Sequence, residues 1–217
     1  MMNYVKNALM SGIIISFILS SLQCVEGEYV ETDDILEAPW AIEVMDYFAK
    51  ISKVDGQIKT YPNCIITRGE GIKMIIFCFN LLSYDNIYNF IDVDKEEWYY
   101  HYICSAYHIG LIQGNEKGEI HPEDNLTRED AAHMIYKICN ILKYPFQEET
   151  EVSAFEDEVE ISEYAKDSVV ILHKNGIIQG EGEGYFCPKE MITRAEMMQM
   201  CYNALMKCQS QGILILE

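Results

Sequence analysis

Apolar positions recur along this chain with a helical period in paired segments. After residue 127, an apolar residue returns every three to four positions, as Ala131, Met134, Ile135, Ile138 and Leu142. This spacing is typical of a helix with one buried face. The segment 98–109 also has helical composition, and the glycine that follows it is a favourable helix end. The stretch 114–122 between the two is rich in turn residues. The pattern therefore predicts a helix, a glycine-rich loop with short extended pieces, and a second helix.

This unit occurs three times. A Thr-Arg pair starts the second helix of each unit, and the three pairs are spaced by 60 and then 66 residues. A proline precedes each threonine by five positions, an aromatic residue by 27 to 29, and an acidic residue lies six or seven positions before the aromatic. In unit order, the prolines are Pro62, Pro122 and Pro188, the aromatics Trp40, Trp98 and Tyr164, and the acids Asp34, Asp92 and Asp157. We expect units at 33–82, 89–142 and 155–206, and a tail at 207–217.

The threonine of each pair is followed three positions later by an acidic residue. Thr67 stands before Glu70, Thr127 before Asp130, and Thr193 before Glu196. A threonine at the N-cap and an acid at the third helical position form a capping box, which satisfies backbone donors at the helix start. We expect all three pairs to cap helices.

The arginine of each pair needs a separate explanation. Arg68, Arg128 and Arg194 are all the arginines of the chain, and a cation in the first helical turn opposes the helix dipole. Two interpretations remain open. The planar guanidinium, with the N–H groups of the helix start, suits an anion such as a carboxylate or phosphate. Alternatively, each arginine forms an internal salt bridge, for instance to Asp34, Asp92 or Asp157.

Composition and the absence of some motifs exclude several classes of function. The 217 residues include 35 Asp and Glu against 16 Lys and Arg, a net charge of −19. Such a charge excludes field-driven binding to nucleic acids. No nucleophile elbow or phosphate loop is present, so we expect no enzyme and no cofactor. His101, Cys104 and His108 share one helix face but lack an evident fourth ligand, so we expect no metal site.

The first 27 residues read as a signal peptide. They carry Lys6 and a short apolar run from Ile13 to Leu22. Acylation at Cys24 and an uncleaved anchor are the alternatives, and contact with a membrane is expected only through this segment. All three interpretations place the remainder outside the cytoplasm. Without Cys24, seven cysteines remain, of which Cys78, Cys139 and Cys201 fall in apolar helical patterns typical of buried thiols.

The combined motifs resemble S-layer homology (SLH) repeats of bacterial surface proteins. The third unit carries the pattern best, as Gly176-Ile177-Ile178-Gln179-Gly180, Gly184-Tyr185-Phe186-Cys187-Pro188 and Ile192-Thr193-Arg194-Ala195-Glu196. The resemblance implies a mostly α-helical fold of three helix-loop-helix repeats. These would lie with pseudo-threefold symmetry around a central helix bundle. It also implies an extracellular, non-catalytic module of the bacterial cell wall or S-layer. Such modules bind secondary cell-wall polysaccharide non-covalently, often through a pyruvylated amino sugar, in grooves between repeats.

The resemblance further implies the site residues. Anion recognition maps to Arg68, Arg128 and Arg194, groove-lining aromatics to Trp40, Trp98 and Tyr164, and close approach of the sugar to Gly110, Gly114, Gly176 and Gly180. The first unit lacks the glycine frame and is degenerate. We therefore expect the best-formed pocket to combine Arg194 with the loop 176–184. The alternative function is an extracytoplasmic scaffold with this fold that has lost polymer binding and contacts another surface protein.

Overall fold

The computed structural model describes residues 39–41, 44, 61–147 and 155–213. The expected signal peptide, Cys24, Asp34 and the loop of the first unit lie outside the described residues. None of the described helices combines the length and apolar composition needed to cross a membrane. The described elements are η2 (Pro39–Ala41), α3 (Arg68–Cys78), α4 (Tyr100–His108), α5 (Arg128–Ile141), η3 (Glu158–Glu160), α6 (Glu163–Lys174), η4 (Gly182–Gly184) and α7 (Arg194–Ser210).

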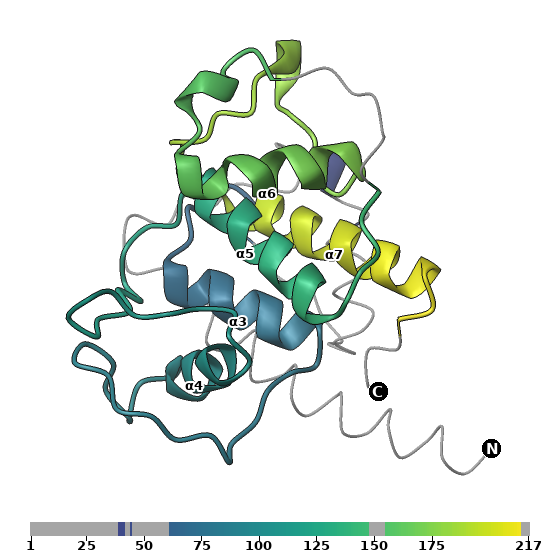
Figure 1. Cartoon of the computed structure of the whole chain (residues 1–217). Helices are drawn as coiled ribbons and strands as arrows, with labels where there is room; N and C mark the ends of the chain where they lie inside the picture. Colours follow the sequence, from purple (N-terminus) through teal and green to yellow (C-terminus); the bar gives the residue numbers. More distant parts are fainter. Residues whose placement is uncertain (1–38, 42–43, 45–60, 148–154, 214–217) are drawn as a thin grey trace.

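The second helices of the three units form the centre of the molecule. Helices α3, α5 and α7 contact one another (Figure 1). Their apolar faces supply much of one continuous core. Each is covered by the first helical segment of the following unit: α4 packs on α3, α6 on α5, and η2 of the first unit on α7. This cyclic arrangement agrees with the predicted mostly helical fold and its pseudo-threefold symmetry.

The three capping threonines start these central helices as predicted. Each has an extended backbone, and its side chain accepts a hydrogen bond from the backbone N–H three residues later. Glu70 and Glu196 complete the box by accepting from the backbone N–H of Thr67 and Thr193 at 2.9 and 2.7 Å. The predicted box at Asp130 is only half formed. The aspartate is one methylene shorter than glutamate and instead accepts the Thr127 hydroxyl at 2.8 Å.

A ring of backbone hydrogen bonds joins the segments just before these helices. Leu126 N donates to Ile66 O at 3.0 Å, Ile192 N to Leu126 O at 2.9 Å, and Ile66 N to Ile192 O at 3.2 Å. The backbone N–H groups of the first two residues of each central helix also donate to carbonyls of a neighbouring unit. The backbone donors that one of the two interpretations assigned to an anion are therefore already used to join the units.

Ion pairs lie beside this ring at two of the three joints, that is, the contacts between one unit and the next. Arg128 Nη1 lies 2.7 Å from Glu196 Oε1, and Arg194 Nη2 lies 2.9 Å from Glu70 Oε1, with both guanidinium groups buried. Of the two interpretations, the internal salt bridge is thus present at both arginines. Its partner is the capping glutamate of another unit, because each arginine extends across the ring to the start of that unit's central helix. Arg68 forms no ion pair with the described residues.

The aspartates that we considered as arginine partners have a different role. Asp157 accepts the backbone N–H groups of Phe186 and Cys187 at 2.8 and 2.7 Å, and Asp92 makes the equivalent contacts in the second unit. Cys187 has φ +59°, in the left-handed region that costs non-glycine residues about 1 kcal/mol or more. In the second and third units the aspartate therefore holds a strained turn directly before the proline that leads into α5 and α7.

The cysteines of the core are thiols. Cys139 and Cys201 are buried, as predicted, while Cys78 is half-buried. None of the seven described cysteines forms a disulfide bond, and the thiols of Cys139 and Cys208 form a hydrogen bond between α5 and α7. Cys78, Cys139, Cys201 and Cys208 pack as small apolar side chains at the contacts between central helices.

We expect Asp157→Ala to destabilise the protein by about 2–4 kcal/mol, because two buried N–H groups lose a charged acceptor. Chemical denaturation monitored by circular dichroism measures the change. Asp167→Ala, on the exposed face of α6, is the matched control and should change the free energy of unfolding by less than about 0.5 kcal/mol. Equal effects of the two substitutions would contradict the role given to Asp157.

We expect Arg194→Met to cost about 3 kcal/mol of stability, because it leaves Glu70 partly buried without its cation. Arg68→Met removes the equivalent arginine at the joint without an ion pair and should cost less than about 1 kcal/mol. The same denaturation experiment compares them. A loss at Arg68 as large as that at Arg194 would show that the ion pair is not the source of the effect.

Candidate functional site

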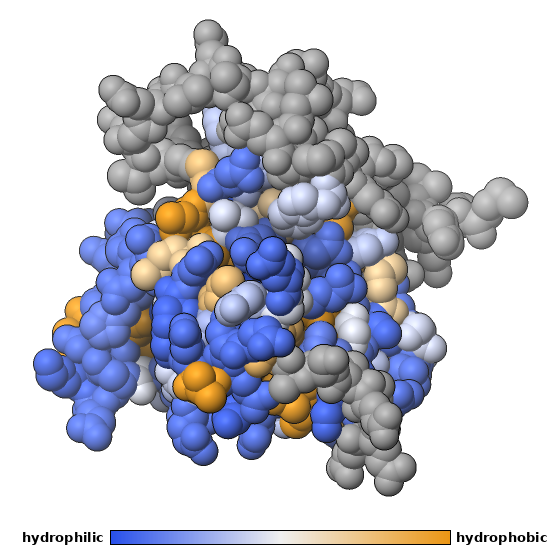
Figure 2. All heavy atoms as spheres, turned by 90° about the horizontal axis from the view of Figure 1, so that it is seen from above, coloured by the Kyte–Doolittle hydropathy of each residue, from blue (hydrophilic) through white to orange (hydrophobic). Residues whose placement is uncertain are grey.

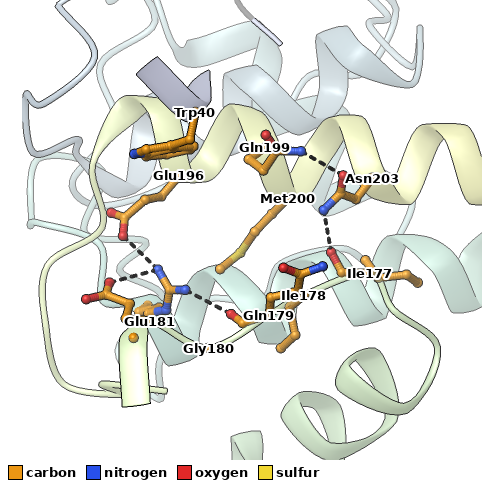
Figure 3. A pocket seen from close by; sticks show the side chains of 12 residues that line it. Trp40, Ile177, Ile178, Gln179, Gly180, Glu181, Glu196, Gln199, Met200 and Asn203 are labelled. Atoms are coloured by element: carbon orange, nitrogen blue, oxygen red, sulfur yellow. Dashed lines mark hydrogen bonds and ion pairs between the residues drawn. The ribbon is translucent and has the colours of Figure 1, made fainter. Parts of the chain in front are cut away.

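A pocket of about 710 Å³ lies where the three units meet. One wall is the loop 177–182 of the third unit, and the opposite wall is Trp40 of η2 in the first unit (Figure 3). The side of α7 that carries Glu196, Gln199 and Asn203 lies between them, and Arg128 of the second unit closes one end. The pocket therefore depends on all three units.

Trp40 supplies an aromatic surface to this pocket. Its side chain is 53% exposed although η2 packs on α7, so the ring is held in place while much of it faces solvent. An aromatic ring of this kind offers an apolar face for the C–H groups of a sugar. Trp40, for which the resemblance implies a groove-lining place, thus lines this pocket, and its contact with a ligand stays a prediction.

Side-chain amides supply the polar part of the pocket. Gln199 Nε2 donates to Asn203 Oδ1 at 2.7 Å, and Asn203 Nδ2 donates to Ile177 O at 2.9 Å (Figure 3). Each amide retains further capacity to donate or accept, as hydroxyl groups require. The sequence reasoning missed both residues. The available signal was their spacing, six and ten positions after Thr193, which places them on the same helix face as Glu196.

Two carboxylates face Arg128 in the pocket. Glu196 Oε1 and Glu181 Oε1 lie 2.7 and 3.3 Å from its Nη1, and its Nη2 donates to Gln179 O at 3.1 Å. Partial burial raises the pKa of the Glu181 carboxyl, and a hydrogen bond to Glu196 raises it further. Burial also opposes the charged form of Glu196, but hydrogen bonds from Thr193 and Glu181 hold the pKa of Glu196 below its ordinary value. The guanidinium is therefore already neutralised.

The predicted pairing of Arg194 with the loop 176–184 is wrong. That loop faces Arg128, whereas Arg194 pairs with Glu70 of the first unit. The reason is the cyclic order of the units, in which each arginine crosses to another unit's helix rather than staying beside the loop of its own.

The two other predicted aromatics occupy places equivalent to that of Trp40. Trp98 is 39% exposed, and Lys73 Nζ of α3 lies 4.8 Å from its ring centre. Burial lowers the pKa of Lys73 to about 8. Tyr164 donates a hydrogen bond to Asp130 Oδ1 of α5 at 2.7 Å. Each aromatic thus lies against the central helix of the preceding unit.

The predicted loop glycines are required by the loop itself. At Gly180, which lines the pocket, a Cβ would lie 2.6 Å from Tyr185 O and 2.9 Å from the Phe155 ring. Gly176 follows α6 with φ +63°, a conformation that favours glycine. Gly110 ends α4 in the same way, and Gly114 contacts the Gly118 backbone. Of these four, Gly180 alone lies in the pocket beside Trp40.

The histidines and cysteine that we considered as metal ligands make other contacts. His108 Nδ1 hydrogen-bonds to the Tyr88 hydroxyl at 3.0 Å, and Cys104 is fully buried. Among the described residues, a different group, Glu181, Cys187 and Glu190, brings three ligand atoms within 4.8 Å of one another. Two of the three are exposed carboxylates, which commonly gather without binding an ion.

The sequence is similar to proteins of bacterial surfaces and to large glycan-degrading enzymes. An amylopullulanase of Thermoanaerobacterium thermosulfurigenes is 32% identical over 83% of this chain, and the exoglucanase XynX of Acetivibrio thermocellus is 34% identical over 77%. The surface-layer 125 kDa protein of Lysinibacillus sphaericus is 28% identical over 62%. The chain spans only 10%, 16% and 11% of these relatives.

The chain also matches a protein-family model. The S-layer homology domain matches residues 89–132 and 154–198, which fall in the second and third units. The first unit lies outside both matched ranges. The match and the S-layer relatives indicate a location at the cell surface or cell wall. Two of the three structural units of this chain therefore carry S-layer homology domain sequence.

Proposed function

We propose that this chain is a non-catalytic module that binds a secondary cell-wall polysaccharide non-covalently, with the pocket beside Trp40 as a sugar site. The observation that carries this proposal is the combination in one pocket of an exposed tryptophan with hydrogen-bonding amides and carboxylates. Apolar stacking on one face and polar groups at the edge match the two kinds of surface that a sugar ring presents.

The polymer unit that we propose is a pyruvylated amino sugar. The match to the S-layer homology domain supports a polymer of the cell wall, and the amide-rich side of the pocket supports a ligand with many hydroxyl or acetamido groups. The described surface in Figure 2 is predominantly hydrophilic, with its hydrophobic side chains in small separate groups. On the described part of the face seen in Figure 2, this distribution favours a polar ligand over a broad apolar protein interface.

We expect Trp40→Ala to weaken sedimentation of the full chain with purified cell walls by about tenfold, because the sugar loses its aromatic surface. The fraction of protein bound is measured across a range of wall concentrations. Tyr84→Ala is the matched control. This tyrosine is 67% exposed and lies outside the pocket, so its removal should leave binding unchanged.

The alternative function makes the opposite prediction in the same experiment. A protein-interaction scaffold that has lost polymer binding would not sediment with walls stripped of protein by detergent and protease. Failure of the unmodified chain to bind such walls would overturn the proposed function. Equal weakening by Trp40→Ala and Tyr84→Ala would overturn the assignment of the pocket.

A further inference from the structure

A second pocket lies at the end of α7 that is remote from the ring of backbone hydrogen bonds. Its volume is about 300 Å³, and it is lined by the ends of α6 and α7 and by the segment that follows α5. Its lining includes Lys174 of α6 and Lys207 of α7. None of the described residues that line it is an aspartate or a glutamate, although the chain has 35 of them. The pocket is therefore a basic site on an acidic protein.

The two lysines of this pocket have no partner of their own. Both are half-buried, and neither ammonium group forms an ion pair or a hydrogen bond with the described residues. Lys207 Nζ lies 3.5 Å from the place that a Cβ at Gly176 would occupy, so this ammonium group rests against the end of α6. Two like charges that share a pocket repel each other, and an anion bound between them removes that repulsion.

The lysines are not needed to complete the two helix ends. A lysine near a helix C-terminus commonly donates to the last carbonyl groups. In α6, the carbonyl oxygens of residues 171–173 accept from the backbone N–H groups of residues 175–177 at 2.9–3.1 Å. In α7, the carbonyl oxygens of residues 207–209 accept from those of residues 211–213 at 2.9–3.3 Å. Both ammonium groups therefore keep their capacity to donate to a ligand.

A buried asparagine holds the third wall of the pocket in place. Asn175 Oδ1 accepts a hydrogen bond from Gln147 N at 2.9 Å, and Asn175 Nδ2 donates to Gln147 O at 3.2 Å and to Ile171 O at 2.8 Å. Tyr144, which is also buried, belongs to the same wall. The walls are thus fixed by the protein's own contacts, which lowers the entropic cost of binding a ligand there.

The charge of the site suits a phosphate group better than a single carboxylate. A lysine ammonium group is a compact point charge, whereas the planar fork of arginine is the group that matches a carboxylate. A phosphate monoester carries a charge of about −1.5 to −2 near pH 7, which two ammonium groups balance. Ser210 Oγ donates to Lys207 O at 2.7 Å and can still accept, and Gln211 adds an exposed amide. These groups suit the hydroxyl groups of a polyol or sugar that carries the phosphate.

The second pocket adjoins the pocket beside Trp40 but shares no lining residue with it. Asn203 of that pocket and Lys207 of this one are four residues apart on α7, which is about 6 Å along the helix. Gly176 and Ile177, neighbours in the sequence, line one pocket each. One surface polymer is therefore able to reach both pockets.

We propose that the second pocket binds a phosphate group between Lys174 and Lys207. At the cell surface this group has two sources, a phosphate ester of a sugar or polyol and free inorganic phosphate. The site uses neither Trp40 nor any arginine, so it stands or fails independently of the proposed sugar site.

Titrations of the full chain followed by NMR test this site with three probes: glycerol 3-phosphate, inorganic phosphate, and glycerate, which carries a carboxylate instead. The phosphate probes should shift the backbone amide signals of Gly176 and Gln211 and bind about tenfold more tightly than glycerate, because they carry more charge. Tighter binding of glycerol 3-phosphate than of inorganic phosphate would identify an ester as the ligand, and equal binding would identify free phosphate. Equal binding of glycerate would overturn the assignment to phosphate.

Paired substitutions separate the site from the net charge of the chain. Lys174→Gln combined with Lys207→Gln should weaken phosphate binding about tenfold or more, because charge-assisted hydrogen bonds are lost. Lys174→Arg combined with Lys207→Arg keeps both charges and should retain most of the affinity. Lys95→Gln combined with Lys117→Gln makes the same change of net charge at two exposed positions outside the pocket and should leave the affinity unchanged.

Trp40→Ala should also leave phosphate binding unchanged, because the two pockets share no residue. No binding of either phosphate probe, amide shifts confined to residues outside the pocket, or an equal loss in the variant with both Lys95 and Lys117 replaced would overturn the phosphate site. Each of these results would leave the proposed sugar site standing. Failure of the chain to bind stripped walls, with phosphate binding intact, would instead overturn the proposed function alone.

Discussion

The closed ring of backbone hydrogen bonds among Ile66, Leu126 and Ile192 is the interaction on which the rest of the molecule depends. Each residue donates to one neighbouring unit and accepts from the other, so no unit has a free edge at the centre. The ring fixes the starts of α3, α5 and α7 relative to one another. Because each arginine directly follows a ring segment, the same constraint decides which helix start it faces, and so which glutamates pair with Arg128 and Arg194.

The ring also explains how equivalent helix starts acquire different properties. The three central helices begin with the same backbone geometry, so their starts differ in the side chains placed at fixed helix positions. Where glutamate stands at the third helical position, it forms an internal ion pair with an arginine of another unit. Where aspartate stands there, the carboxylate is held by hydroxyl groups of Thr127 and Tyr164 instead. The length of the side chain at this one position thus accompanies a difference in whether the capping carboxylate pairs with an arginine.

Local signals in the sequence predicted the local structure well. The capping threonines, the helical period of the central helices and the glycine after α4 each depend on a few neighbouring residues. The partners of the arginines could not be predicted in this way. Arg128 and Glu196 are separated by 68 residues, and Arg194 and Glu70 by 124, so their pairing depends on the order of the units around the ring. For the same reason, the pocket took its arginine from a different unit than expected. Gln199 and Asn203 were missed because their role appears only when Trp40 lies opposite them.

The packing of η2 on α7 affects how the protein folds. The chain's first described residues pack against its last helix, and the ring bond from Ile66 to Ile192 joins segments 126 residues apart. An open array of repeats gains stability one repeat at a time and can fold from any point along its length. A closed cycle cannot, because a chain that ends after two units leaves both α5 and α3 without their full complement of neighbours. Folding should therefore be cooperative across all three units and slow for a helical protein, since its decisive contacts are the most distant in sequence.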